Sequence, residues 1–462
     1  MPDSHNKKPT PSPRLAIPFL VALAVLTVVA FIIPLRPTQS YEEKRNLAKF
    51  PEFSVEALVS GDYFDDISTW FSDTFPGREG WMDLNGALSE LHGYSQIVIQ
   101  GDIPQGDEIP VLSDQTTATF SPETEPEETV PEETGPTEPI ILETVEPPTT
   151  PVEQWGGVDA GEGAEIGYAN SVIQIGDTLF NYCSFSQAGS DRYIRTVNKC
   201  AQSLMDKDVQ IVSAPIPTSI GIMVEKEHLE KLHCAAQDEI IDYMHAGTSD
   251  RVIKTDVYDI LVDHNDEYLY FRTDHHWTAR GAYYAYVQIM EDLGREPASL
   301  ESFEEWDQGQ FAGSLGGSAA YPSKLKWDNV YAYIPQGDIE MMIYRSAEGG
   351  FAWPLLTDMS QKEVNTKYMT FLAGDHALCI VTNNSIPEGT NCVVIKDSYG
   401  NPLIPFLTQN YHKVYVIDYR KYNTMKLSRF VDEYEIDDVI LLNNLNAAQN
   451  AAVNDMLEWL VG

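Results

Sequence analysis

The chain has 462 residues, of which 43% are hydrophobic and 11% aromatic, and this is enough for one large folded core. Asp and Glu number 70 against 30 Lys and Arg, which gives a formal net charge of −40 at pH 7. This negative charge excludes the basic surface of a general nucleic-acid-binding protein, so we expect no nucleic-acid partner.

The first predicted element is an almost unbroken apolar segment at residues 15–34. A helix of about twenty such residues crosses a bilayer hydrocarbon core of about 30 Å. The residues that follow it contain no Ala-x-Ala cleavage site, so we expect an uncleaved single-pass anchor instead of a removed signal peptide. Basic residues flank the segment on both sides and leave its orientation open. The short tail at 1–14 favours a cytoplasmic N-terminus, with the C-terminal domain extracytoplasmic at the cell membrane.

Two segments of different composition follow the predicted anchor. Residues 35–100 have apolar side chains at helical spacing, which predicts a membrane-proximal helical region. Residues 101–165 are rich in Pro, Thr, Glu and Gly, and no Lys or Arg occurs between Arg78 and Arg192. With few apolar side chains to bury, this acidic insert is predicted to be disordered. A solvated spacer is the favoured interpretation, and an acidic ligand-binding tract is the alternative.

The remaining residues, 166–462, alternate short apolar runs with amphipathic stretches. This pattern predicts an α/β domain with a mainly parallel sheet flanked by helices. Ligands of such sheets bind beyond the carboxyl ends of the strands. The expected strands are 209–212, 252–253, 393–395, 414–417 and 438–442, and the expected helices are 195–207, 279–293 and 401–410.

A carboxylate and an imidazole, those of Asp274 and His276, stand two residues apart just before one of the expected helices. In an extended turn both emerge on one side of the backbone, and His275 points to the other side. Ser398 lies in a tight turn directly after an expected strand, so its hydroxyl is presented there. A serine nucleophile needs a base, and the base needs a carboxylate that orients it. We expect Ser398 to be the nucleophile, His276 the base and Asp274 the orienting carboxylate.

A structural interpretation of the same residues stays open. The segment at 274–277 can serve only to lead into a helix that Thr278 caps. Likewise, Ser398 can be an ordinary turn residue beside Asp397, because both residue types are common in turns.

The turn after Ser398 also holds groups suited to an oxyanion. Gly400 permits close approach of the backbone, and the N–H groups after the serine can point at a developing negative charge. Arg420 follows the strand at 414–417 and can bind an anionic sugar or polarise the acyl group, unless a salt bridge with Asp418 or Asp397 holds it. The candidate oxyanion and substrate residues are Tyr399, Gly400, Asn401, Arg420, Asn443 and Asn444.

We expect no metal ion and no cofactor. Asp274, His275 and His276 are suitable ligand types, but adjacent histidines rarely converge on one tetrahedral ion, and no second ligand cluster follows. The cysteines lie far apart without Cys-x-x-Cys spacing, and their odd number rules out complete pairing. Buried free thiols are therefore expected at Cys183, Cys200, Cys234, Cys379 and Cys392.

Several motifs together resemble those of the DHHW protein family, which is related to the SGNH-like domains of the alginate O-acetyltransferases. They are Asp-His-His-Trp at 274–277, Lys-Asp-Ser-Tyr-Gly-Asn at 396–401, the string at 414–420, and the segments at 41–47 and 73–78. The resemblance implies an SGNH-hydrolase-like fold in which an Asp-x-His pair precedes the nucleophilic serine. It also implies acyl chemistry at that serine.

Residues and resemblance together predict a membrane-anchored enzyme that forms an acyl-Ser398 intermediate. The expected substrates are O-acetyl groups of a cell-envelope polysaccharide, as acyltransferase or as esterase, and the sequence does not separate the two reactions. A transferase with one membrane span implies a multi-span partner that transports acyl groups, as similar polysaccharide acetylation systems have. The alternative is a noncatalytic envelope binding or assembly protein in which the same residues only hold the turns together.

Overall fold

We describe the fold from a computed structural model, in which residues 171–344 and 349–462 form the main folded part. The predicted anchor at 15–34 and most of the predicted insert at 101–165 lie outside the described residues, so both stay predictions. Within the described part, no helix is long and apolar enough to cross a membrane. The other described residues are 39–40, 45–46, 49–51, 63, 67, 70, 71, 74, 98–100, 106–110, 158 and 166–169.

The chain divides into two units, and the smaller one comprises residues 1–95 and 321–323. It contains the antiparallel strands β1 (Gln39–Ser40) and β2 (Arg45–Asn46), and its residues 63, 67, 70 and 71 are helical. The larger unit, residues 96–320 and 324–462, holds the predicted α/β domain.

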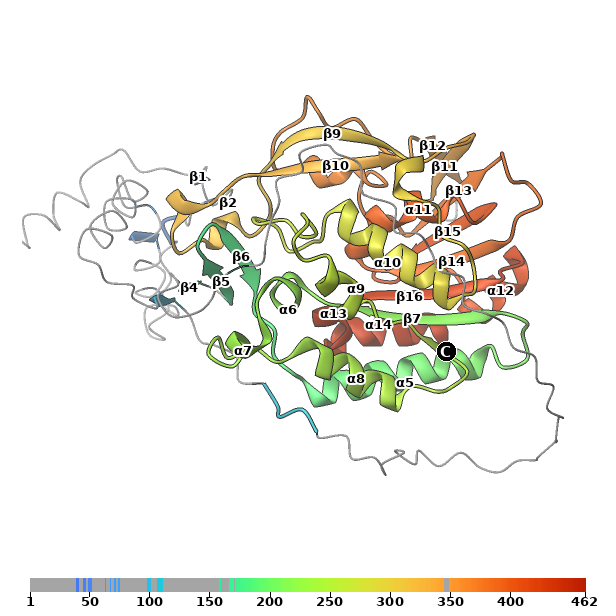
Figure 1. Cartoon of the computed structure of the whole chain (residues 1–462), viewed down its shortest axis with the longest axis horizontal. Helices are drawn as coiled ribbons and strands as arrows, with labels where there is room; N and C mark the ends of the chain where they lie inside the picture. The colour runs from blue at the N-terminus through green and yellow to red at the C-terminus, as the bar shows by residue number, and fades with distance from the viewer. Residues whose placement is uncertain are drawn as a thin grey trace, which may run out of the picture. The chain divides into compact units, whose positions relative to one another are not determined.

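An eight-stranded sheet forms the centre of the larger unit (Figure 1). Its parallel half has the order β15-β14-β16-β7-β8. The first four of these strands are almost wholly buried, because helices cover both faces of the parallel half, and this explains their continuous apolar sequences. The strands are β7 (Gln210–Ile216), β8 (Ile253–Lys254), β14 (Asn391–Lys396), β15 (Lys413–Asp418) and β16 (Asp438–Asn444).

The other half of the sheet is antiparallel. β13 (Leu378–Asn383) pairs antiparallel with β15, β11 (Ile339–Tyr344) with β13, and β12 (Gly350–Trp353) with β11. The sheet is therefore mixed, and the prediction of a mainly parallel sheet is wrong for this half. Antiparallel neighbours need only a short turn, so no helix separates β11 from β12 to announce the pairing.

Helices lie on both sides of the sheet (Figure 1). β14 connects to β15 in one direction along the sheet, whereas β15 connects past β14 to β16 in the opposite direction. Right-handed crossovers then place the two connecting helices on opposite faces. One side carries α5 (Gln187–Ser203), α8 (Gln237–Gly247), α12 (Leu427–Tyr434) and α14 (Ala451–Val461), and the other carries α10 (Ala279–Asp292) and α11 (Ile404–Leu407).

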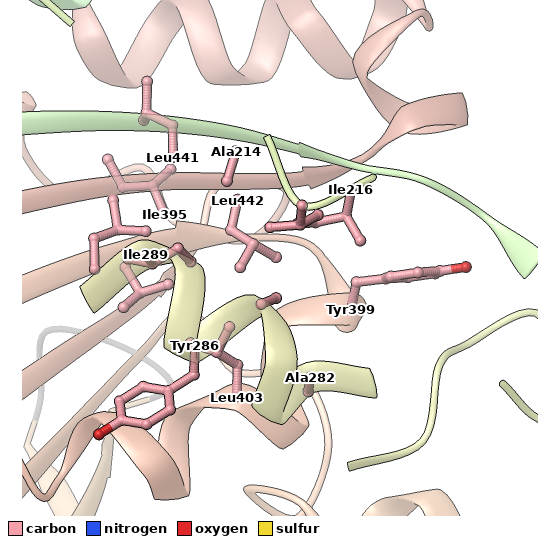
Figure 2. Packing of buried hydrophobic residues seen from close by; sticks show 14 of the residues in the cluster. Ala214, Ile216, Ala282, Tyr286, Ile289, Ile395, Tyr399, Leu403, Leu441 and Leu442 are labelled. Carbon is pink, nitrogen blue, oxygen red and sulfur yellow. The ribbon is translucent and has the colours of Figure 1, made fainter. Parts of the chain in front are cut away.

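Helix α10 fixes one of the loops at the carboxyl edge of the sheet. Figure 2 shows its residue Ile289 pointing toward Ile395 of β14, and both side chains are fully buried. The helix begins where predicted, because the Thr278 side chain accepts a hydrogen bond from the Gly281 N–H at 3.4 Å. The loop before Thr278 is therefore held over the ends of the central strands.

The remaining elements are short. β3 to β6 form a four-stranded sheet, and β9 and β10 form an antiparallel pair. Residues 106–110 lie within the predicted insert, yet the Asp107 N–H donates to the Phe185 carbonyl at 2.8 Å, so this piece is not part of a free spacer. The bounds are β3 (Val98–Gln100), β4 (Ile166–Ala169), β5 (Val172–Ile175), β6 (Thr178–Asn181), β9 (Glu304–Phe311), β10 (Asp328–Ile334), α6 (Ser219–Met223), α7 (Lys226–Leu229), α9 (Tyr258–Asp263), α13 (Leu445–Ala448), and the 3-10 turns η1 (Leu300–Ser302), η2 (Gly316–Ser318), η3 (Pro322–Lys324), η4 (Lys367–Thr370) and η5 (Ser398–Leu403).

The predicted elements are found with different bounds. The helix expected at 195–207 is the second half of α5, and the helix expected at 401–410 is the turn η5 followed by the short α11. All five cysteines are free and buried, which confirms that expectation.

Candidate active site

Ser398 stands at the carboxyl edge of the central strands, two residues after β14 ends. The carboxylate of Asp397 shapes this turn: Oδ1 accepts from the Tyr399 N–H at 2.9 Å and Oδ2 from the Asn444 backbone and side-chain N–H groups at 3.0 and 2.8 Å. Burial raises the pKa of Asp397, and these donors oppose the rise. The result is a half-buried serine on a turn fastened to the end of β16.

The three predicted side chains form one continuous hydrogen-bonded chain. His276 Nε2 lies 2.7 Å from Ser398 Oγ, and His276 Nδ1 lies 2.6 Å from Asp274 Oδ1. Burial opposes ionisation of Asp274, but His276, His275 and the Ser314 N–H outweigh burial and hold its pKa well below the usual range. An ionised Asp274 requires the proton on Nδ1 of His276, which leaves Nε2 free to accept the serine proton.

His275 does not point away from its neighbour, contrary to the alternation argument. The two imidazole rings lie 3.8 Å apart between centroids, with 37° between their planes. Residues 272–276 form a bend instead of an extended segment, so alternate side chains do not separate. His275 Nδ1 pairs with Ser314 Oγ at 2.9 Å, and burial lowers the pKa of His275 to about 4. Its ring is therefore neutral at pH 7.

Tyr368 contacts both halves of the site and was not predicted from the sequence. Its ring stacks on His276 at 4.0 Å between centroids, and its hydroxyl donates to the Ser398 carbonyl at 2.9 Å. Two more ties join the same loops: Trp277 Nε1 donates to the Tyr399 carbonyl, and the Tyr399 hydroxyl donates to the His275 carbonyl. These contacts fix the distance between base and nucleophile.

Asp328 anchors the loop that carries the acid and base. Its buried carboxylate accepts from the Arg272 and Thr273 N–H groups at 2.8 Å, and from the hydroxyls of Thr273 and Tyr268. Asp328 begins β10, more than fifty residues from the loop it holds, so no local pattern announces the contact. It positions Asp274 without touching the reacting atoms.

Most of the predicted oxyanion donors are already used inside the protein. The Tyr399 N–H binds the Asp397 side chain and the Gly400 N–H binds the Asp397 carbonyl at 3.1 Å, so the prediction that these backbone groups point at an oxyanion is wrong. Asn443 Nδ2 donates to the Tyr419 hydroxyl at 2.8 Å, and Asn444 Nδ2 to Asp397. In this geometry each amide nitrogen has one of its two N–H groups engaged within the protein.

Asn401 and Arg420 belong to a charged network beside the serine turn. The buried Lys396 ammonium and Asn401 Nδ2 reach Asp375 Oδ1 at 2.9 and 3.1 Å, and Arg420 Nη2 reaches Asp375 Oδ2 at 2.8 Å. Arg420 also binds Asp418 through Nε and Nη2 at 2.9 and 2.6 Å, which is the salt bridge weighed from the sequence. Among the described residues Arg420 Nη1 has no hydrogen-bond partner, so of the guanidinium donors this one remains for a ligand.

The sequence profile of the DHHW protein family matches residues 43–121 and 141–417, well over half of the chain. The chain belongs to the DHHW protein family. The family relationship predicted from the motifs is thereby confirmed, and the matched residues include Asp274, His276 and Ser398. They end before Arg420, so the loop after β15 lies outside the matched part.

Solved structures share the fold of this DHHW family member. A DHHW family protein from Eubacterium siraeum is 22% identical, with a TM-score of 0.58 over 64% of this chain and 98% of that one. Bacillus cereus PatB1 with a sulfonyl adduct is 16% identical, with a TM-score of 0.52 over 62% and 99% of the two chains. At such identities the likeness shows an α/β fold alone.

Weaker comparisons add little. The O-acetyltransferase domain of Pseudomonas putida AlgJ is 12% identical over 64% of this chain and 99% of that one, with a TM-score of 0.35, which is too low to carry an argument. No match to the chain is found among curated proteins.

The DHHW motif also offers three potential metal ligands, whose atoms lie within 4.8 Å of one another at Asp274, His275 and His276. Two ligands of one tetrahedral zinc ion lie about 3.4 Å apart, because each bond is about 2.1 Å long. Asp274 Oδ1 and His276 Nδ1 are only 2.6 Å apart, a hydrogen-bond distance. The pair is therefore arranged as a proton-sharing couple and does not fit a metal centre.

Gly313 is expected to be required for activity. A Cβ atom there would lie 2.3 Å from the Asp274 Cβ and 2.4 Å from the Thr273 carbonyl oxygen, so Gly313→Ala displaces the acid. A displacement of about 1 Å lowers turnover about 100-fold. Gly316→Ala is the matched control, because its Cβ would meet nothing within 4 Å. Ester hydrolysis assays of both variants check this, and equal activities would contradict it.

Asp375 is expected to contribute to the decline of stability in acid. Burial opposes its ionisation, but Lys396 and Arg420 outweigh burial and hold its pKa well below the usual range. A carboxyl with a lowered folded-state pKa stabilises the fold fully above its unfolded-state pKa of about 3.9, and this stabilisation is lost as the pH falls toward the folded-state value. As the pH is lowered from about 5 to 3, the free energy of unfolding of Asp375→Asn should therefore fall less steeply than that of the wild type.

Urea denaturation at several pH values measures this slope. Glu388→Gln is the control, since its carboxyl is exposed and should leave the slope unchanged. An Asp375→Asn variant whose stability falls with pH as steeply as that of the wild type would show that the network does not hold Asp375 ionised.

Proposed function

We propose that the chain is a serine acyltransferase or esterase that acts on O-acetyl groups of a cell-envelope polysaccharide through an acyl-Ser398 intermediate. The observation that carries the proposal is the hydrogen-bonded triad Asp274–His276–Ser398. Its two hydrogen bonds, from Asp274 Oδ1 to His276 Nδ1 and from His276 Nε2 to Ser398 Oγ, are 2.6 and 2.7 Å long. A noncatalytic protein needs no such triad, because Ser398 can hold its turn without a hydrogen bond between its hydroxyl and an imidazole.

In the acylation half-reaction, His276 Nε2 takes the proton of Ser398 Oγ as Oγ attacks the acetyl carbonyl carbon. The tetrahedral intermediate collapses, the bond to the leaving oxygen breaks, and His276 gives the same proton to that oxygen. Asp274 stabilises the imidazolium between the two steps and stays ionised throughout. The acetyl group is then an ester of Ser398.

In the deacylation half-reaction, His276 removes the proton of an incoming hydroxyl, which attacks the acetyl-serine carbonyl. Collapse of this second intermediate breaks the bond to Ser398 Oγ, and His276 returns the proton to Oγ. A sugar hydroxyl as acceptor gives O-acetyl transfer, and water gives ester hydrolysis. The two outcomes differ only in the acceptor, so binding of a glycan decides between them.

The choice of an acetyl group and a glycan as substrates rests on the resemblance of the motifs to those of the alginate O-acetyltransferases. The sulfonyl adduct in PatB1 supports the choice of serine chemistry, since sulfonyl groups attach to nucleophilic atoms. The predicted anchor at 15–34 favours an extracytoplasmic domain at the cell membrane. One span cannot carry acetyl groups across a bilayer, so a transferase of this kind works with a multi-span partner that transports acyl groups.

The test uses the full chain in detergent with 4-nitrophenyl acetate as donor and an isolated envelope glycan as acceptor. We expect release of 4-nitrophenol by the wild-type chain and not by Ser398→Ala, and acetyl ester on the glycan by mass spectrometry. A folded wild-type chain that turns over the donor no faster than Ser398→Ala would refute the proposal.

A further inference from the structure

A cavity of about 320 Å³ lies beside the charged network of the site. Its walls come from the loop after β15 and from helix α14, two segments that follow residue 417, where the family match ends. The volume is within the range of about 300 to 1,000 Å³ that small-molecule sites occupy. It is lined by residues 419–423 of the loop, among them Arg420 and Lys421, and by Asp455, Met456 and Trp459 of α14.

The cavity has an exposed aromatic wall. Trp459 is 41% exposed and Met456 is 36% exposed, and their spacing of three residues places them on one face of α14. Burial of large apolar side chains is favourable, yet these two stay partly open to solvent. Two large apolar side chains left open in one hollow suggest a surface kept for a ligand.

The indole ring of Trp459 is held in place before any ligand arrives. The Lys426 ammonium lies 4.5 Å from the ring centroid and donates to the Trp459 carbonyl. Trp459 lines the cavity and Lys426 does not. A fixed aromatic face suits the flat side of a sugar ring, whose C–H groups pack on the negative face of the π system.

A sugar also needs hydrogen-bond partners for its hydroxyl groups, and the cavity supplies them. Arg420 Nη1 has no partner among the described residues, while Nε and Nη2 hold the guanidinium in place through Asp418 and Asp375. Asn423 is exposed on the same loop and offers an amide. An apolar wall beside fixed polar donors matches a saccharide better than it matches a lipid or an apolar peptide.

The wall of the cavity is joined directly to the serine turn. Asp375 binds Arg420 on the cavity side with one oxygen, and with the other it binds Lys396 and Asn401, which flank Ser398 in the sequence. A sugar that rests on Trp459 therefore lies in the same cavity as Arg420, which the Asp375 network joins to the serine turn. The net charge of −40 repels polyanions, which favours a neutral chain.

We propose that this cavity is a subsite for a sugar residue of a neutral acceptor glycan, with Trp459 as its stacking platform and Arg420 Nη1 as a hydroxyl donor. The role of the bound glycan as acetyl acceptor rests on the proposed function. The binding of a saccharide in the cavity does not. Such a subsite would place a sugar hydroxyl at the acetyl-serine in preference to water.

The experiment measures binding of chitopentaose and cellopentaose to the full chain that carries Ser398→Ala, by isothermal titration calorimetry. Adding Trp459→Ala should weaken binding of the better ligand at least tenfold, which is about 1.4 kcal/mol. Trp459→Phe keeps an aromatic face and should weaken it less than fivefold. Trp353→Ala is the matched control, because Trp353 is 43% exposed on β12, outside the cavity, and should change binding less than twofold.

Equal losses for Trp459→Ala and Trp353→Ala would overturn the subsite, as would failure of both saccharides to bind a folded chain. Melting curves of each variant show whether a loss reflects unfolding, and the Phe variant tests the ring separately from the fold. A chain that binds saccharide through Trp459 but does not turn over an acetyl ester would keep the subsite and refute the proposed function.

Discussion

Replacing Ser398 by alanine is expected to lower the turnover of an acetyl ester by about four orders of magnitude, with little change in melting temperature. His276→Ala should cost as much, and the double variant no more than either, because residues of one triad act as a unit. Asp274→Asn should also lose about four orders of magnitude, since an amide N–H can donate to His276 Nδ1 and favour the wrong tautomer, and the amide carries no charge to stabilise the imidazolium. Steady-state hydrolysis of 4-nitrophenyl acetate measures all four variants.

His275→Ala is the matched control for His276→Ala. Both rings belong to the same bend, and their centroids are 3.8 Å apart, but only His276 is hydrogen-bonded to the hydroxyl of Ser398. We expect a loss of about tenfold at His275, from looser packing of the base. Equal losses at the two histidines in well-folded variants would contradict the assignment of the base.

Removing the carboxylate of Asp328 should damage both stability and turnover. Asp328→Ala leaves the Arg272 and Thr273 N–H groups and two hydroxyls without their buried acceptor. Each unsatisfied donor costs about 1 to 3 kcal/mol, so we expect a loss of about 4 kcal/mol in the free energy of unfolding. The freed loop should also misplace Asp274 and lower turnover about 100-fold.

Asp338→Ala separates this effect from the mere loss of a carboxylate. Asp338 is exposed, and its replacement should change the free energy of unfolding by less than about 1 kcal/mol. Urea denaturation and ester hydrolysis of both variants provide the two measurements. An Asp328→Ala variant with wild-type turnover per folded molecule would show that the anchor does not position the acid.

The parts of the site predicted from the sequence are those with a local signature. Asp274 and His276 are two residues apart before a helix that Thr278 caps, and Ser398 follows an apolar strand, so each is recognisable within a short window. Their mutual contact spans 122 residues, and its prediction rested on the roles of the three residues in a triad and on the family resemblance. The four central strands were found because their apolar runs are uninterrupted.

The parts that were missed depend on contacts between distant segments. Tyr368 lies in the 3-10 turn η4, Gly313 in a loop and Asp328 at the start of β10, and nothing around them in the sequence indicates that they reach the bend at 272–276. The antiparallel half of the sheet was missed although β13 contains the apolar run 378–381 and β11 the run 341–344. Several residues of both strands are partly exposed, and an apolar run does not reveal the direction in which a strand pairs. The prediction that the Tyr399 and Gly400 N–H groups point at an oxyanion was wrong because the Asp397 side chain and carbonyl accept hydrogen bonds from them.

The most direct test of the account is covalent labelling of the full chain with a sulfonyl fluoride, followed by peptide mass spectrometry. The hydrogen-bonded chain predicts one sulfonyl adduct, on the peptide that contains Ser398. This adduct should be absent from Ser398→Ala and should form at least 100-fold more slowly in His276→Ala. No adduct at Ser398, under conditions that label a control serine hydrolase, would contradict the claim that Asp274 and His276 make this serine a nucleophile.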